Sequence, residues 1–87
     1  MKAQIVVSRN IRRLRVAKGV SQEAFAVDAG IDRTYVSRLE RALENPTVAV
    51  LEKLARALGV DIADLFDGSK VGRAQINPLP KGRRKRA

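Results

Sequence analysis

The 87-residue sequence contains no cysteine and no histidine, and aromatic residues make up only 3% of it. Without cysteine the chain can form neither a disulfide framework nor a thiolate metal site, and without histidine it lacks the commonest general base and metal ligand. A glycine-rich phosphate-binding loop is also missing, so too few groups remain for general acid–base or nucleophilic chemistry. The sequence therefore argues against an enzyme, and it predicts neither a cofactor nor a metal.

Long hydrophobic runs are missing as well. No apolar run approaches the roughly 20 residues that span a membrane, and the start of the sequence lacks the hydrophobic region of a signal peptide. We therefore expect a soluble, cytoplasmic protein. Apolar residues are 45% of the chain, nearly all of them aliphatic, and this length allows one small domain with a thin margin of stability unless it oligomerises.

What the sequence has in excess is positive charge. The net charge is +9 and the pI is about 11.1, which favours a polyanionic partner. Residues 1–66 carry eleven Lys and Arg against eight Asp and Glu, whereas residues 67–87 carry seven against one. We therefore expect a mildly basic globular domain over 1–66 and a strongly basic, flexible tail over 67–87, which has too little apolar content to order itself.

The domain is organised around residues 21–41, which read as two short helices joined by a tight turn. Ser21 is a suitable N-cap of the first helix, and Gly30 lies where that helix should end, because glycine tolerates the left-handed conformation found just past a helix. Asp32 is a suitable N-cap of the second helix. Two helices packed across so short a turn form a helix-turn-helix.

The second helix of this motif, expected at about residues 32–42, has two different faces at about 100° per residue. One face carries arginine and hydroxyl side chains: Arg33, Thr34, Ser37, Arg38 and Arg41. The other face carries large apolar side chains: Tyr35, Val36, Leu39 and Leu43. Ten residues make a rod of roughly 15 Å, which suits a DNA major groove about 12 Å wide. We therefore interpret this segment as a recognition helix.

The rest of the domain reads as three further helices, so the predicted fold is all-α with five helices. Apolar residues at helical spacing indicate a first helix over about 5–18 and a fourth helix between Thr47, its N-cap, and Gly59, its stop. Asp61 opens a short fifth helix. The apolar face of that helix consists of Ile62, Leu65 and Phe66.

These elements resemble the lambda-repressor-like helix-turn-helix family, in its xenobiotic-response-element branch of small prokaryotic and phage regulators. The matching text is SQEAFAVDAGIDRTYVSRLER, then NPT and LEKLARALGVDIADLF, and the similarity runs from about Ile5 to Phe66. The resemblance implies a transcriptional regulator that binds double-stranded DNA. It also implies a buried bridge between Arg15 and Glu40 that locks the first helix to the recognition helix.

The candidate DNA-binding residues are Gln22, Arg33, Thr34, Ser37, Arg38, Arg41 and Asn45. Arg33 and Arg38 are the candidates for base reading, because arginine pairs bidentately with guanine in the major groove. The threonine and serine hydroxyls between them carry less sequence information. The resemblance places the other three, Gln22, Arg41 and Asn45, at phosphate-contacting positions.

The sequence departs from the family after the recognition helix. The family usually has glycine where Ala42 stands, and often a basic residue near Leu43 or Glu44. Without that glycine we expect the recognition helix to run on by one residue. We also expect Glu44 to repel nearby phosphate, which weakens the backbone contacts of this loop with DNA.

A homodimer is expected, because one recognition helix reads only about four or five base pairs, too few to specify a site in a genome. Its expected surface is Ile62, Leu65 and Phe66, extended by Val71 and Ile76. Restriction–modification controllers, phage-type repressors and host regulators all share this short layout. The antitoxin of a toxin–antitoxin pair, with the tail or the fifth helix binding the toxin, is the alternative function.

The tail generates the first testable prediction. Removal of residues 81–87 should weaken binding to all DNA sequences alike, because five positive charges are lost. In salt titrations on a random duplex, the slope of log K against log salt should fall by up to ~0.9 for each phosphate that the tail contacts. An unchanged slope would show that these residues do not touch DNA.

Overall fold

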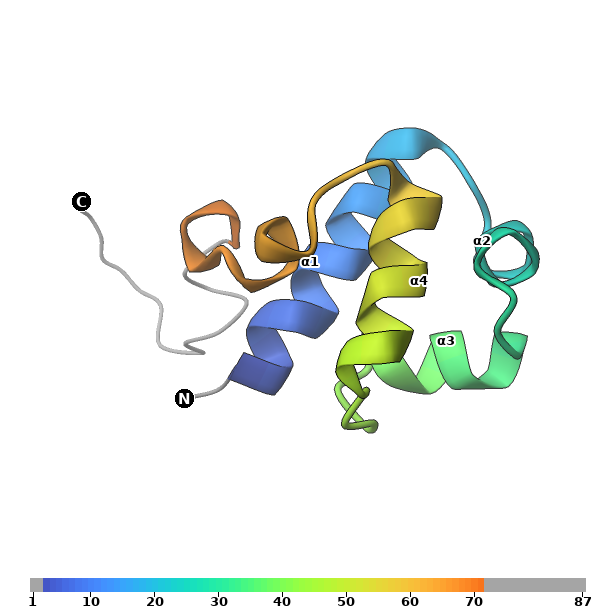
Figure 1. The fold of residues 1–87 in the computed structure, drawn as a ribbon, viewed down its shortest axis with the longest axis horizontal. Coiled ribbons are helices and arrows are strands. Elements are labelled where there is room, and N and C mark those ends of the chain that lie inside the picture. Colours follow the sequence, from blue (N-terminus) through green and yellow to red (C-terminus); the bar gives the residue numbers. More distant parts are fainter. Residues whose placement is uncertain (1–2, 72–87) are drawn as a thin grey trace.

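The computed structural model describes residues 3–71, and every regular element in this part of the chain is a helix (Figure 1). The α-helices are α1 (Ala3–Lys18), α2 (Gln22–Ala29), α3 (Arg33–Glu40) and α4 (Val48–Leu58), and they are followed by two 3₁₀ helices, η1 (Ile62–Phe66) and η2 (Gly68–Lys70). The predicted all-α class is confirmed. None of the helices between residues 3 and 71 is long and apolar enough to cross a bilayer.

The predicted count of five α-helices is wrong, because the fifth element, η1, is a 3₁₀ helix. The Asp64 amide donates to the carbonyl of Asp61, three residues earlier, at 2.9 Å. The carboxylate of Asp64 in turn accepts from the Asp61 amide at 3.2 Å, which closes a capping box at the start of the element. Because η1 has only five residues, its amides bond to carbonyls three residues earlier, which is the tighter pattern common in short helices.

Both motif helices begin where the sequence predicts, and α2 also ends there. The Ser21 hydroxyl accepts from the Ala24 amide at 3.0 Å, and the Asp32 carboxylate accepts from the Thr34 amide at 2.9 Å. Gly30 has a φ of 69°, the left-handed conformation that lets the chain leave α2 and enter α3 after a turn of only a few residues. The N-caps satisfy amide groups that each helix leaves unpaired at its start.

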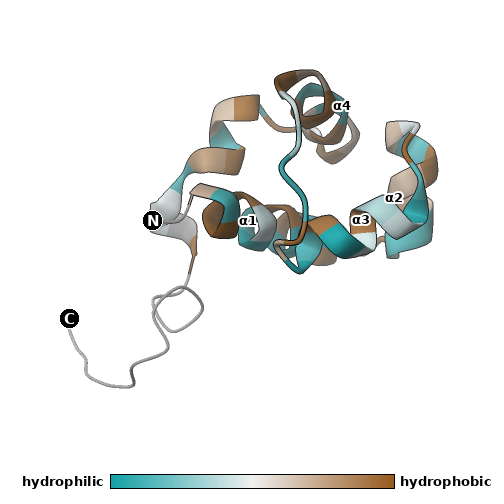
Figure 2. Ribbon diagram, turned by 90° about the horizontal axis from the view of Figure 1, so that it is seen from below, coloured by the Kyte–Doolittle hydropathy of each residue, from teal (hydrophilic) through white to brown (hydrophobic). Residues whose placement is uncertain are grey.

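The helices enclose one aliphatic core. In Figure 1, α1 and α4 lie next to each other, and α2 and α3 lie at one side of this pair. Figure 2 shows hydrophilic and hydrophobic segments alternating along the helices, as expected when each helix turns one face inward. The largest fully buried apolar side chains come from all five of the main elements: Ile11, Phe25, Val36, Leu39, Leu54 and Leu65.

Burial corrects the dimer surface expected from the sequence. Leu65 has no exposed area and Val71 is only 8% exposed, so both belong to the core of a single chain and offer nothing to a second copy. Ile62 is half-buried against the same core, and only Phe66 stays substantially exposed. Ile76 lies outside the described residues. The fifth element is therefore mainly a part of the core.

The described structure continues past Phe66, where the predicted tail begins. Asn10 of α1 is fully buried, and its side-chain nitrogen donates to the backbone carbonyls of Leu65 at 3.0 Å and Asp67 at 3.1 Å. These two bonds tie the junction of η1 and η2 to the middle of α1. Residues 72–87, with the basic run of the predicted tail, lie outside the described residues.

The expectation that the recognition helix runs on at Ala42 is wrong. Helix α3 ends at Glu40, and Ala42 has a φ of 61°, the one positive φ at a non-glycine residue between residues 3 and 71. The Ala42 amide donates to the Leu39 carbonyl at 3.0 Å, and the Leu43 amide donates to the Arg38 carbonyl at 2.9 Å. These two bonds form a Schellman motif, in which alanine occupies the position that usually holds glycine.

Ala42→Gly should therefore stabilise the protein. The left-handed conformation costs an L-residue about 1–2 kcal/mol, and this exceeds the entropy that a new glycine adds to the unfolded chain, about 0.4–1 kcal/mol. We expect a net gain of up to about 1 kcal/mol and a melting temperature higher by a few degrees.

The matched control is Gly59→Ala. Gly59 has a φ of 74°, and a Cβ there would meet no atom within 4 Å, so the substitution adds backbone strain alone. Thermal unfolding should shift in opposite directions for the two variants. A lower melting temperature for Ala42→Gly would contradict strain at this residue.

Candidate nucleic-acid interface

Helix α3 presents a polar face to solvent and an apolar face to the core. Val36 and Leu39 are buried, with 0% and 1% of their area exposed. The predicted contact residues of α3 and its flanks are exposed or, for Ser37, half-buried: Arg33, Thr34, Ser37, Arg38, Arg41 and Asn45. Leu43 was expected on the apolar face, but it is 48% exposed because the helix has ended before it.

Tyr35 lies at the border of the two faces, half-buried against the core. Burial raises the pKa of its hydroxyl above the ordinary value of about 10, and the negative charge of Glu44 raises it further. The phenol therefore keeps its proton throughout the physiological range. It stays available as a neutral hydrogen-bonding group at the edge of the polar face of α3.

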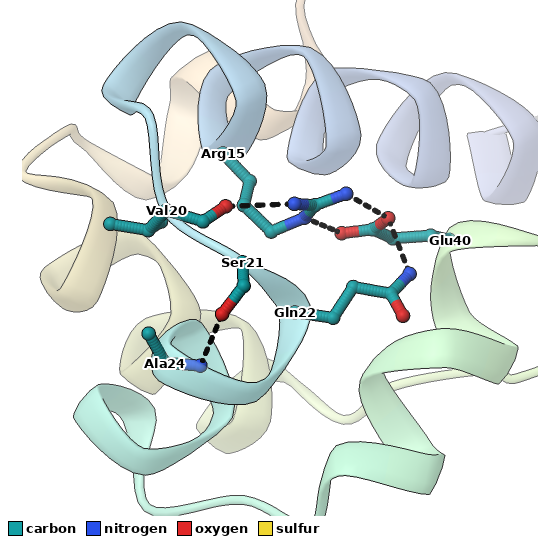
Figure 3. A network of polar contacts seen from close by, with 6 residues as sticks. All are labelled: Arg15, Val20, Ser21, Gln22, Ala24 and Glu40. Carbon is teal, nitrogen blue, oxygen red and sulfur yellow. Dashed lines mark hydrogen bonds and ion pairs between the residues drawn. The ribbon is translucent and has the colours of Figure 1, made fainter.

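A polar network fixes α3 to the rest of the domain (Figure 3). The Arg15 guanidinium binds both carboxylate oxygens of Glu40, through Nε to Oε2 at 2.6 Å and through Nη2 to Oε1 at 3.0 Å. Its remaining nitrogen, Nη1, donates to the Val20 carbonyl at 2.8 Å. The Glu40 side chain is 2% exposed and that of Arg15 is 12% exposed. The pair is thus bidentate and largely shielded from water.

Gln22, the first residue of α2, also contacts this network. Its side-chain nitrogen donates to Oε1 of Glu40 at 3.0 Å, as Figure 3 shows. One carboxylate on α3 therefore receives donors from both α1 and α2. The side chain of Gln22 is held at the junction of the two motif helices, and its contact with a phosphate stays a prediction.

A second ion pair lies on the exposed face. Nε of Arg38 donates to Oε2 of Glu44 at 2.8 Å, and Nη2 of Arg38 lies 3.3 Å from the Leu43 carbonyl. The side chains are 45% and 28% exposed. Glu44 was expected to act only by repelling phosphate, and the sequence offered no sign of this contact, since residues six apart do not face each other on a helix. The turn at Ala42 brings them together.

Gln4 is a residue of this region that the sequence did not single out. Its side-chain nitrogen donates to the carbonyls of Ala42 and Glu44, both at 2.9 Å. The start of α1 thereby holds the loop that follows α3. A lone glutamine near the N-terminus has no recognisable pattern, because its partners lie about forty residues further along the chain.

Helix α3 is thus a short amphipathic helix held rigidly at the surface, with three arginines on its exposed side. Residues 11–65, more than half of the chain, match the helix-turn-helix family HTH_3. The chain belongs to this family. The match covers α2 and α3 completely, together with most of the core that supports them.

Individual relatives of this helix-turn-helix chain agree with the assignment. It is 33% identical over 73 residues to control protein C.BamHI from Bacillus amyloliquefaciens, covering 83% of this chain and 90% of the relative. The crystal structure of the restriction–modification controller C.AhdI from Aeromonas hydrophila has a TM-score of 0.70 at 40% identity, covering 72% of this chain and 91% of that one.

A third similar protein is the restriction–modification controller C.Esp1396I, whose structure was solved as a tetramer in complex with its natural 35 base-pair operator. It has a TM-score of 0.70 at 35% identity, covering 76% of this chain and 87% of that one. The resemblance to the lambda-repressor-like helix-turn-helix family, inferred from the sequence, is confirmed.

Glu40→Ala should destabilise the domain by roughly 3–5 kcal/mol, because it leaves the shielded Arg15 guanidinium without its carboxylate. That is a large share of a total of about 5–15 kcal/mol. Glu44→Ala is the matched control: it removes the same group from an exposed pair, which contributes about 0–1 kcal/mol. Urea unfolding measures both. Equal, small losses would show that the network at Glu40 does not stabilise the fold.

Proposed function

We propose that this protein is a sequence-specific, double-stranded DNA-binding transcriptional regulator of the restriction–modification controller type, and that it binds an inverted-repeat operator as a homodimer. The observation that carries the proposal is the exposed face of α3. Arg33, Arg38 and Arg41 point away from a helix whose opposite face is buried, and whose last residue is bound to α1 and α2. A rigid cationic helix of this size suits the major groove.

The contacts divide into two groups. On α3, Arg33 and Arg38 are the base-reading residues, with the hydroxyls of Thr34 and Ser37 beside them. Phosphates are contacted at the edges of the face by Arg41, by Asn45 and by Gln22 at the start of α2. These contacts set the register of the helix in the groove. The list of proposed DNA-binding residues is therefore Gln22, Arg33, Thr34, Ser37, Arg38, Arg41 and Asn45.

The three similar proteins support the controller class over the antitoxin alternative, since each is named as a control or controller protein. The tetramer of C.Esp1396I on its operator also supports binding by more than one copy. With Leu65 and Val71 in the core, Phe66 and the half-buried Ile62 are the apolar residues near the end of the domain that remain for a dimer contact.

Selection of bound sites from random double-stranded DNA tests this function. The selected sequences should contain an inverted repeat, with half-sites about 34–36 Å apart on one face of the duplex. Footprinting should show both halves protected, and sedimentation should give a dimer. A strictly monomeric protein that protects a single short half-site would contradict the homodimer, and selection that returns no shared sequence would contradict sequence-specific binding.

A pair of arginine variants controls for charge in this experiment. Arg33→Ala should weaken the selected site by about 1–3 kcal/mol more than a random duplex, because a bidentate base contact is lost. Arg56→Ala removes the same charge from an exposed position in the last turn of α4. It should weaken both duplexes alike, and only slightly.

A further inference from the structure

The guanidinium of Arg38 is held along one of its two edges. Its side-on edge, formed by the N–H groups of Nε and Nη2, is directed at Oε2 of Glu44 and at the carbonyl of Leu43. Its end-on edge, formed by the N–H groups of Nη1 and the second N–H of Nη2, has no partner among residues 3–71. In the free domain, Arg38 therefore has one edge occupied and a complete two-donor edge open.

The loop that holds Arg38 is itself held. The left-handed turn at Ala42 folds the chain back over the end of α3, and the Leu43 amide closes that turn onto the Arg38 carbonyl at 2.9 Å. Gln4 of α1 then binds the carbonyls of Ala42 and Glu44. Glu44 is thus fixed to the body of the domain through its backbone while its carboxylate reaches Arg38.

The neighbouring arginines of the same face are not restrained in this way. Arg33 is exposed, and its side chain has no hydrogen bond or ion pair with any other residue between 3 and 71; the same holds for Arg41. A free arginine side chain has many rotamers, and binding a base in one of them carries an entropic cost that a preorganised side chain avoids. Of the three arginines on the face, Arg38 alone carries this restraint in the described part of the chain.

We infer that Glu44 is a positioning residue for DNA recognition: it holds Arg38 by the side-on edge, so that the end-on edge is presented to a guanine, and it thereby strengthens the sequence preference at the base pair that Arg38 reads. The inference rests on the proposed function and deepens it. Glu44 also brings a negative charge close to the DNA, which weakens binding to every sequence equally. The ratio of specific to random affinity separates the two effects, because only positioning changes it.

A double-mutant cycle on that ratio tests the inference. The ratio is measured for the parent, Glu44→Ala, Arg38→Ala and the double variant, at one salt concentration, with the selected site and a random duplex. Glu44→Ala should raise binding to the random duplex but lower the ratio by about fivefold to tenfold, a part of what a bidentate base contact provides. In the Arg38→Ala background, Glu44→Ala should leave the ratio unchanged.

Site selection with Glu44→Ala and with Arg38→Ala adds a second measurement, the base preference at each position of the site. A purely structural role of Glu44 would not change this preference at one base pair alone. Both variants should lose preference at the same base pair in each half-site and keep it elsewhere. Glu44→Gln, which keeps an oxygen acceptor for Arg38 without the charge, should restore most of the ratio. Glu52→Ala removes the same charge from an exposed position on α4 with no described partner, and it should leave the ratio at the parent value.

Three outcomes overturn the inference. A ratio that is unchanged in Glu44→Ala, with both affinities raised by one factor, makes Glu44 a source of repulsion alone. A ratio that rises shows that Glu44 withholds Arg38 from the DNA. Additive effects in the double variant show that the two residues act separately. A parent protein with no preferred site overturns the proposed function itself, and this is seen before any variant is compared.

Discussion

The orientation of helix α3 depends on one buried carboxylate, that of Glu40. Helix α3 has only eight residues, too few to be stable in isolation, so its place must come from contacts with the rest of the chain. Val36 and Leu39 anchor it by apolar contact, but such contact is non-directional. The bidentate bond to Arg15, with the added donor from Gln22, sets its direction.

The position of Glu40 explains why it needs these donors. A carboxylate in the last turn of a helix lies at the negative end of the helix dipole, and Glu40 is also almost fully shielded from water. Both factors oppose a charge there, and the facing guanidinium of Arg15 and amide of Gln22 compensate for them. If α3 were oriented differently, the Glu40 carboxylate would lose these donors and remain buried without compensation. The bonds to Glu40 therefore favour this one orientation of α3. One side chain thereby ties α1, α2 and α3 into the arrangement that exposes three arginines on one side.

Local signals in the sequence predicted most of the fold, and non-local contacts account for what they missed. The caps at Ser21 and Asp32 and the stop at Gly30 depend on neighbouring residues, so their chemistry is visible in a short stretch of sequence. The burial of Leu65 depends on how η1 docks on α1, which periodicity cannot show. At the site, the exposed face of α3 followed from helical spacing, whereas the pairing of Arg38 with Glu44 did not.

That pairing depends on a local turn at Ala42 and on a contact with Gln4, which is distant in sequence. Ala42 retains its left-handed conformation because the bonds of the Schellman turn and the amide of Gln4 fix it from both sides. Strain of this kind persists only where the surroundings determine the backbone, and it is commonest at functional sites. Here the strained residue turns the chain back and places the Glu44 carboxylate beside an arginine on the exposed face of α3. The two glutamates at this end of α3 thus lie in different surroundings: the buried Glu40 bonds to α1 and α2, and the partly exposed Glu44 bonds to Arg38 of α3 itself.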